Sequence, residues 1–537
     1  MHHNILLILA LLFAVMLLVL LAKRIKVAYP IFLVIAGLGI SFIPGVPVLH
    51  LDPNLIFLIF LPPLLYEAAW YTSWNDFWKW KRPISLLAFG LVFFTSTIVA
   101  YATTAIIPGF TLALGFLLGG IVSPPDAVAA ATVLKGMSVP KRILTILEGE
   151  SLVNDASSLI VFKFALLAIL TGTFSMQQAT GQFFQVAGMG IVIGLAGAHI
   201  MYAIHRFLPT TPAIDAALTV MTPYLLYLAA EQFHYSGVMA VVSGGLFMSY
   251  RSHEVFRTGS TRINMLGVWN TMIFVMNALV FVLIGLVLPD IIAGLGDYSV
   301  ADGIKYGLIV SGIIIALRFL WVYPAAHIPR WLSAKVRQDP SPGWKGPLII
   351  SWAGMRGVVS LATALSIPVL MYDKVTPFPQ RNLIIFITFV VIFITLVFQG
   401  LSLPLIIKWL KVKEIDNIVP EEEQLAGIQL RLDQVALKTL GEKYDNAMQH
   451  NELIRIYKSN MENEILNVTQ RLASMECDAS QAKEIKAYHK MLLEIYARQR
   501  KELFLLRKEK FFSDEEIRKA EMQLDLNELK ITNSMHL

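Results

Sequence analysis

The stretch Thr111–Leu134 reads TLALGFLLGGIVSPPDAVAAATVL. It is almost wholly apolar, and it is long enough to cross the hydrocarbon core of a bilayer, which takes about 20 residues of helix. Pro124 and Pro125 interrupt it in the middle, and an acidic residue, Asp126, follows at once. Two prolines remove backbone donors, and backbone freed inside a membrane is tolerated only where it lines an enclosed cavity. The stretch therefore predicts a membrane-spanning helix that is broken at mid-depth.

A second apolar run, residues 346–371, carries a similar interruption at Gly354-Met-Arg-Gly357. The two interrupted runs are the fifth and the twelfth along the chain. Two broken spans in corresponding halves of a chain are typical of transporters built from inverted repeats, with a binding site at the membrane midplane. A separation of seven spans fits two inverted six-helix repeats around one linker helix.

The chain as a whole divides into an apolar body and a charged tail. It is 56% hydrophobic and 15% charged. Residues 1–410 carry 15 acidic and 24 basic side chains, whereas the shorter segment 411–537 carries 23 and 20. We therefore expect residues 1–410 to form a transmembrane domain and residues 411–537 a cytoplasmic helical domain, either a bundle or a dimerising arm.

Thirteen apolar runs have about the length of a spanning helix. They are residues 4–22, 29–44, 54–71, 84–107, 111–134, 143–171, 182–206, 213–230, 235–250, 267–288, 303–328, 346–371 and 382–410. Loops rich in Lys and Arg alternate with loops that contain neither, which puts the N-terminus outside and the tail in the cytoplasm. The prediction is an all-α polytopic protein of about 13 transmembrane helices in the cell (inner) membrane, embedded in the lipid bilayer. The net charge of +6 comes from helix-end residues of the body, so it does not indicate a nucleic-acid partner.

A few ionisable side chains lie inside the apolar runs. They are Glu67, Asp126, Glu148, Glu150, Asp155, Arg318 and Arg356. A charge within a membrane costs several kcal/mol, so such residues suggest a function. Other ionisable residues, among them His205 and Asp215, lie near predicted helix ends, where a polar side chain reaches water.

The segment 148–158 concentrates polar oxygens on one helix. Ser151 and Asp155 are four residues apart and share a face, which Glu150 and Asn154 flank. Carboxylate, hydroxyl and amide oxygens together suit an alkali cation. A carboxylate in a low-dielectric cavity also holds a proton more readily than in water, so proton and cation can compete for one group. The alternative is a polar contact between helices that binds no ion.

Arg318 and Arg356 need counter-charges, because arginine stays protonated. Glu150 is a natural partner for one of them. We interpret such a pair as structural, since it would hold the broken helices in register.

Four blocks carry a resemblance to a known family: Leu61-Pro-Pro-Leu-Leu-Tyr-Glu67, Ser123–Ala129, Gly149-Glu-Ser-Leu-Val-Asn-Asp155 and Gly354-Met-Arg-Gly357. Over about residues 1–410 the chain resembles the monovalent cation/proton antiporters, which include bacterial and archaeal sodium/proton antiporters and animal sodium/hydrogen exchangers. The third block is the most specific. At the first break the chain departs from the family, which commonly has Asp-Pro there, so its backbone carbonyls are expected to point differently.

The resemblance implies a role for each candidate site residue. Asp155 would be the carboxylate that exchanges proton and cation, with Asn154 beside it. Ser151 and Asp126 would help Asp155 to coordinate Na⁺, and Glu67 would line the same cavity.

The resemblance also implies that Glu150 pairs with Arg318 and that Arg356 lies in the second broken helix. The Asn-Asp pair is similar to that of the electroneutral branch, which exchanges one cation for one proton. Members are typically homodimers in which a core bundle moves like an elevator against a dimerisation domain. No cofactor is implied.

The expected function is exchange of Na⁺ (or Li⁺) for H⁺, and three alternatives stay open. The first is K⁺/H⁺ antiport, because oxygen ligands alone do not separate Na⁺ from K⁺. The second is a cation channel, although no repeated filter is visible in the sequence. The third is a transporter-like membrane sensor that signals through the tail, although the tail has no catalytic or DNA-binding motif. An enzyme is not expected, because the acidic residues are not accompanied by a metal-ligand histidine cluster.

Overall fold

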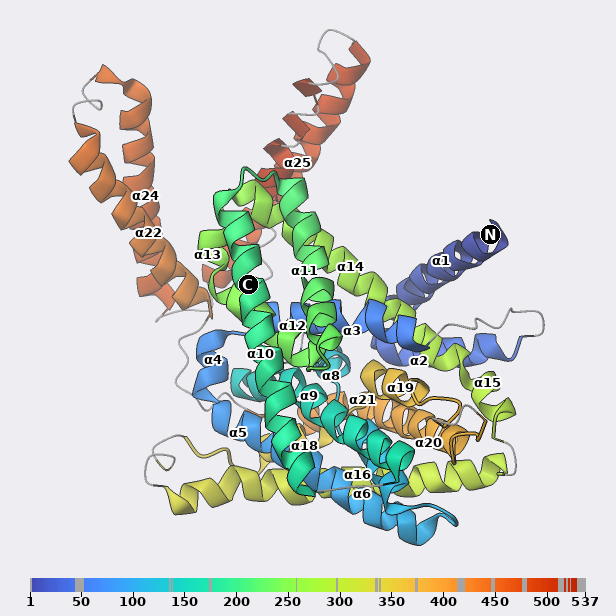
Figure 1. Ribbon diagram of the computed structural model, residues 1–537. Helices are drawn as coiled ribbons and strands as arrows, with labels where there is room; N and C mark the ends of the chain where they lie inside the picture. Colours follow the sequence, from blue (N-terminus) through green and yellow to red (C-terminus); the bar gives the residue numbers. More distant parts are fainter. Residues whose placement is uncertain are drawn as a thin grey trace. The chain divides into compact units, whose positions relative to one another are not determined.

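All regular elements of the computed structural model are helices in the part of the chain that it describes, and one isolated backbone bridge joins Leu370 and Pro377. The described residues are 2–43, 53–134, 137, 139–172, 176–256, 258–295, 298–333, 337, 340–371, 375–412, 421–445, 450–475, 481–509, 516–517, 520–521 and 523–528. The chain forms two compact units, Met1–Asp416 and Asn417–Leu537 (Figure 1).

The larger unit consists of long apolar helices joined by short ones. Its first helices are α1 (His2–Arg24), α2 (Tyr29–Ser41), α3 (Pro53–Tyr71), α4 (Trp74–Lys79), α5 (Lys81–Ser85), the π-helical turn η1 (Leu86–Leu91), α6 (Val92–Ile106), α7 (Leu112–Val122), α8 (Ala127–Leu134) and α9 (Lys141–Thr171). The others are α10 (Met176–Phe207), α11 (Pro212–Gln232), α12 (Gly237–Tyr250), α13 (Ser252–Val255), α14 (Gly259–Leu286), α15 (Leu288–Ala293), α16 (Val300–Leu332), α18 (Lys345–Trp352), α19 (Val358–Leu365), α20 (Arg381–Phe393), the π-helical turn η2 (Ile394–Gln399) and α21 (Gly400–Leu410).

Seven helical stretches of the described residues are long and apolar enough to cross a membrane. They are Lys81–Ile106, Lys141–Thr171, Gly181–Phe207, Pro212–Gln232, Gly259–Ala293, Val300–Leu332 and Arg381–Leu410. Shorter apolar helices, α2, α7 and α12, accompany them. The count of thirteen spans and the inverted repeats remain predictions.

Both expected helix breaks are confirmed. In the fifth apolar run, α7 ends at Val122 and α8 begins at Ala127. In the twelfth, α18 ends at Trp352 and α19 begins at Val358. Each break therefore places two helix ends, with their unpaired backbone groups, in the middle of an apolar run.

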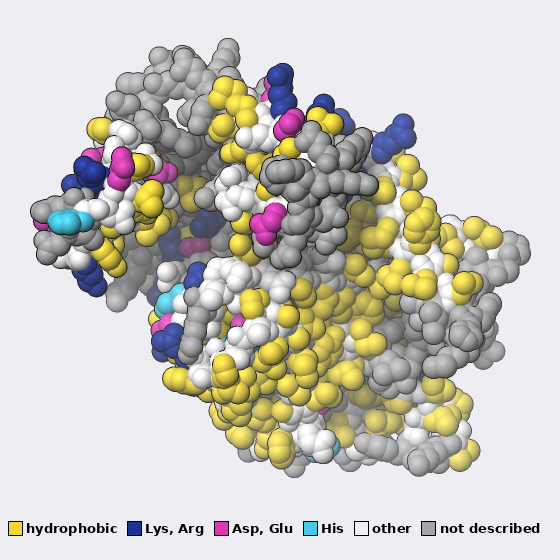
Figure 2. Space-filling view, turned by 90° about the horizontal axis from the view of Figure 1, so that it is seen from above, with side chains coloured by type: hydrophobic (Ala, Val, Ile, Leu, Met, Phe, Trp, Pro, Cys, Tyr) yellow, Lys and Arg dark blue, Asp and Glu magenta, His cyan; other side chains and the backbone are white. Residues whose placement is uncertain are grey.

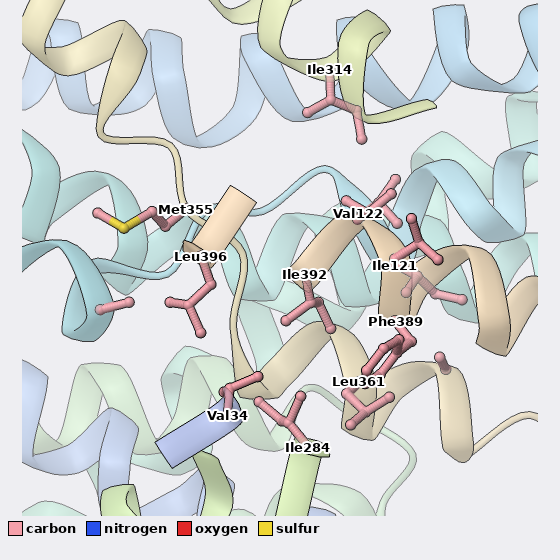
Figure 3. Packing of buried hydrophobic residues seen from close by; sticks show 14 of the residues in the cluster. Val34, Ile121, Val122, Ile284, Ile314, Met355, Leu361, Phe389, Ile392 and Leu396 are labelled. Atoms are coloured by element: carbon pink, nitrogen blue, oxygen red, sulfur yellow. The ribbon is translucent and has the colours of Figure 1, made fainter. Parts of the chain in front are cut away.

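Buried aliphatic side chains from the broken helices and their neighbours form the main core. Figure 3 shows Val34 of α2, Val122 of α7, Met355 of the second break, Leu361 of α19 and Leu396 of η2 in this cluster. A second cluster joins α3, α11, α12 and α14. Hydrophobic side chains also cover a broad part of the outer surface in Figure 2, as expected where lipid replaces water.

The smaller unit consists of charged amphipathic helices. They are α22 (Glu421–Lys443), α24 (Glu452–Met475) and α25 (Gln481–Glu509). α22 packs against α24. Ion pairs one helical turn apart, such as Arg498 with Glu494 at 3.0 Å, lie on the exposed faces and contribute a few tenths of a kcal/mol each. The helical nature expected of the tail is confirmed.

Within the larger unit, α2 and α14 pack backbone to backbone. A Cβ on Gly37 would overlap the Val282 carbonyl oxygen, and a Cβ on Gly285 would overlap the Leu38 nitrogen and the Val34 carbonyl. Small residues allow this close approach, which is a common way for helices to associate in membranes.

We expect Gly285→Val to lower the stability of the larger unit by about 1–3 kcal/mol, because the added side chain forces α14 away from α2. The measurement is the melting temperature of the purified chain in detergent. Gly267→Val is the matched control, because it lies on the same helix and has no neighbouring atom within 4 Å of its Cβ position. Equal melting temperatures for the two variants would contradict the prediction.

Candidate functional site

The two helix breaks lie against each other. The Asp126 N–H donates to the Met355 carbonyl at 2.7 Å, so the backbone of the first break is bonded to the backbone of the second. Gly357 faces Asp126 so closely that a Cβ at this position would overlap the carboxylate. Glycine is therefore the residue type that allows the two breaks to meet.

Arg356 caps the end of α7 from the opposite break. Its side chain is 1% exposed, and it donates from Nε to the Val122 carbonyl at 3.0 Å and from Nη2 to the Ser123 carbonyl at 3.4 Å. Nη1 donates to the Gly354 carbonyl, and the Arg356 backbone N–H donates to Thr395 Oγ1 at 3.1 Å. These carbonyls belong to helix ends that carry partial negative charge. The counter-charge expected for Arg356 is thus supplied by backbone dipoles.

Asp126 and Asn154 bond the first break to its surroundings. Asp126 Oδ1 accepts a hydrogen bond from the Val128 N–H at 2.8 Å, which caps the start of α8. Asn154 of α9 donates from Nδ2 to the Pro125 carbonyl at 3.0 Å. The Asn154 side-chain oxygen is fully buried and, among the described residues, has no hydrogen-bond partner. An acceptor is therefore available at the crossing of the two breaks.

Asp155 follows Asn154 on α9 and is 7% exposed. Its carboxylate lies near enough to that of Asp126 for the two negative charges to repel each other. Ser158 Oγ donates to the Asp155 backbone carbonyl, and within the described part of the chain no donor reaches the Asp155 carboxylate. A buried carboxylate in this situation needs a proton or a cation as its partner.

The other two residues expected at the site, Ser151 and Glu67, lie on α9 and α3. Ser151 is half-buried on α9, one turn before Asp155. Glu67 is half-buried on α3, at a recess that Trp70 and Trp269 also line. The structure thus brings together Asp126, Asn154 and Asp155, whereas the place of Glu67 in the same cavity stays a prediction.

Glu150 and Arg318 form the expected pair. The guanidinium donates from Nη1 and Nη2 to the two carboxylate oxygens at 2.6 and 2.8 Å, and the two side chains are 0% and 1% exposed. Arg318 Nε donates to the Ile350 carbonyl at 3.0 Å. The pair therefore joins α9, α16 and α18 just beside the second break.

Several residues near the site were not anticipated from the sequence. Thr395, in the turn η2, receives the Arg356 N–H, and Tyr29 of α2 lies within electrostatic range of both Asp126 and Glu67. Elsewhere in the larger unit, His205 lies in the last turn of α10 as expected, but it is buried and its Nδ1 bonds to Asp215 at 2.8 Å. The signal for Thr395 in the sequence is that it is a polar residue inside the apolar run 382–410.

The chemistry of the crossing is that of oxygen ligands. Carboxylate, amide and carbonyl oxygens lie there, and in the described residues no group of three or more His, Cys, Asp or Glu is arranged to hold a metal ion. Hard oxygen ligands of low total charge suit a monovalent cation that binds reversibly.

Comparison with known proteins gives the family. The model of the transmembrane sodium/hydrogen exchanger matches residues 8–409. The chain belongs to the sodium/hydrogen exchanger family. It is 33% identical, over 81% of its own length and 66% of the relative's, to the sodium, potassium, lithium and rubidium/H(+) antiporter of Bacillus pumilus. It is 36% identical, over 70% of its length and 58% of the relative's, to the antiporter of the same name from Bacillus subtilis. The chain thus spans less than two thirds of the length of either relative.

The fold is also that of a solved exchanger structure. The sodium proton antiporter MjNhaP1 from Methanocaldococcus jannaschii superimposes with a TM-score of 0.57, over 75% of this chain and 98% of that one, at 18% identity. The chain is therefore a multi-pass membrane protein with an antiporter fold. The sodium/hydrogen exchangers are a family of transporters and not of enzymes.

We expect Glu150→Gln to destabilise the larger unit by about 3–5 kcal/mol, because it leaves the buried Arg318 charge without its partner. The change is measured as a fall in melting temperature in detergent. Glu231→Gln is the control, because Glu231 bonds Lys163 at 2.9 Å at the surface, where a pair contributes under about 1 kcal/mol.

The double variant Glu150→Leu/Arg318→Met distinguishes the stability lost through an unpaired buried charge from the stability lost through altered packing. It removes both charges, so it should recover much of the stability that Glu150→Gln loses. A single Glu150→Gln variant as stable as Glu231→Gln would contradict the structural role of the pair.

Proposed function

We propose that this exchanger is a secondary transporter that moves Na⁺ or Li⁺ across the membrane in exchange for H⁺. The observation that carries the proposal is the buried Asp155 carboxylate: among the described residues it receives no hydrogen bond, and the side-chain oxygen of its neighbour Asn154 has no partner there either. A proton on Asp155 would neutralise it. A cation held by Asp155, Asp126 and Ser151 would do the same. Because both ligands need the same carboxylate, binding of one releases the other.

The proposed exchange is electroneutral. Asp126 already accepts the hydrogen bond that caps α8, whereas Asp155 has no donor among the described residues, so Asp155 is the group that takes up the exchanged proton. One carboxylate that carries either one H⁺ or one Na⁺ moves the same charge in both directions.

The proposal extends to the organisation of the chain in the cell. Residues 1–410 would be the exchanger and residues 411–537 a cytoplasmic domain, with the N-terminus outside the cell (inner) membrane. The homodimer and the elevator movement implied by the family resemblance belong to the same proposal. The homodimer predicts that two copies of the chain, each with its own pair of helix breaks, purify together.

K⁺/H⁺ exchange is the second candidate function. The two Bacillus relatives carry potassium and rubidium in their names beside sodium and lithium. Oxygen ligands at a crossing formed partly by backbone adapt to cations of different radius, which is the physical basis for a broad selectivity.

We expect Asp155→Asn to abolish exchange while the protein stays folded, because an amide cannot take up the exchanged proton. The full chain is reconstituted in liposomes with an inward proton gradient, and the fluorescence of a pH dye is followed as Na⁺, Li⁺ or K⁺ is added. Asp302→Asn, which removes a carboxylate from the exposed first turn of α16, should exchange normally. Full activity of Asp155→Asn would refute the role of this carboxylate, and a response to K⁺ equal to that to Na⁺ would favour the second candidate.

We expect the initial rate of Na⁺/H⁺ exchange to be unchanged when thiocyanate is added. Thiocyanate crosses the bilayer and dissipates any membrane potential that the transporter generates, so it accelerates only electrogenic exchange. The measurement uses the same liposomes with and without the anion. A rate that rises severalfold with thiocyanate would contradict one-for-one exchange.

A further inference from the structure

A cavity of about 660 Å³ opens in the larger unit, away from the crossing of the breaks. The residues that line it lie between the end of α4 and the start of η1, at the start of α9, at the end of α16, at the start of α18 and directly after α21. These helices pack against one another in the fold (Figure 1). Nothing in the exchange mechanism uses this cavity.

Basic side chains surround the cavity. They are Lys79, Lys81, Arg82, Arg142, Arg330, Lys345 and Lys411. None of the described residues that line the cavity is acidic. Lys81, Arg82 and Lys411 are exposed at its rim, so their positive charges face the same space. A concentration of cations of this kind attracts a ligand with phosphate oxygens.

The floor of the cavity is apolar. Leu87, Ile143, Ile146, Val322 and Ile350 line it and are buried. A small inorganic anion would leave this apolar surface uncovered. A ligand with a charged end and a hydrocarbon end would fill both parts.

Tryptophan side chains mark the level of the cavity in the membrane. Trp80 and Trp344 line it, Arg142 stacks over the Trp80 ring at 4.1 Å, and Lys81 lies 4.2 Å from the centre of the Trp78 ring. Tryptophan with lysine and arginine is characteristic of the boundary between hydrocarbon and headgroups. This composition is the one expected of a cavity at the level of the phospholipid headgroups.

We propose that this cavity binds an anionic phospholipid, with the phosphate on the basic rim and an acyl chain on the apolar floor. The bound lipid would also act on the exchanger. Ile350 lines the cavity, and its carbonyl accepts the hydrogen bond from Arg318, so the same turn of α18 contacts both the lipid and the buried ion pair. Lys345, at the start of α18, donates to the carbonyl of Leu410 at 2.7 Å and so joins the exit of α21 to the same wall.

The test uses the full chain in a neutral detergent. Dioleoylphosphatidylglycerol, dioleoylphosphatidylcholine or soluble glycerol phosphate is titrated in, and the melting temperature is followed, with native mass spectrometry to count bound lipid. The cavity variant is Lys81→Gln/Arg82→Gln/Lys411→Gln. The matched control, Lys23→Gln/Arg24→Gln/Lys26→Gln, removes three exposed charges at the end of α1, outside the cavity.

We expect phosphatidylglycerol to raise the melting temperature of the wild type and the control more than phosphatidylcholine does. In the cavity variant the half-saturating mole fraction of phosphatidylglycerol should rise about tenfold or more, because three phosphate-facing charges are lost. If that variant fails to fold, Lys411→Gln alone should shift the titration in the same direction by a smaller factor.

Three results would overturn the proposal. The first is a cavity variant that responds like the control, and the second is a wild type that responds equally to both lipids. The third is saturation by glycerol phosphate at the same concentration as the lipid, with the lipid then excluded, which would identify a soluble phosphate ester as the ligand.

Discussion

The contact between the two helix breaks is the constraint from which the rest of the larger unit follows. Inside a membrane every backbone N–H and C=O must find a partner within the protein, and two broken helices leave four helix ends unpaired at mid-depth. Here the breaks satisfy each other: the Asp126 N–H bonds to Met355, and the Arg356 guanidinium covers the end of α7. Gly357 has to be glycine because any side chain would separate the two. Separating the breaks would leave all of these groups unpaired at once.

The need of every buried charge and polar group for a partner also explains where an ion could bind. Arg318 is neutralised by Glu150, Arg356 by carbonyls, and Asp126 accepts the bond that caps α8. Among the described residues, the Asp155 carboxylate and the side-chain oxygen of Asn154, its neighbour on α9, remain without a hydrogen-bond donor. In a membrane bulk water cannot supply the missing partner, so in the proposed mechanism a proton or a small cation supplies it. The proposed binding site is thus the part of the polar network that the described residues do not complete.

Local sequence predicts the breaks well but not how they are joined. Pro124-Pro125 and Gly354 to Gly357 interrupt apolar runs, so the interruptions are visible without any knowledge of the fold. Two of the carbonyls that accept from the Arg356 guanidinium, those of Val122 and Ser123, lie more than 230 positions away in the chain, and backbone groups carry no residue-specific signal. Thr395 was not anticipated either, because the Arg356 N–H that it accepts lies 39 positions away in the chain. An acidic residue in an apolar run indicates a buried charge, but its neighbours are decided by tertiary packing.

α18 connects the crossing with the surface cavity. It has only eight residues, so about 12 Å of helix separates its two ends. One end carries Lys345 and borders the basic cavity, and the chain that leaves the other end forms the second break. A helix this short does not bend along its length, so its two ends move together. A ligand in the cavity that binds more tightly to one position of α18 therefore favours the matching arrangement of the break, by as much as its affinities for the two positions differ. In this fold α18 is thus the element through which a ligand in the basic cavity would act on the proposed cation site.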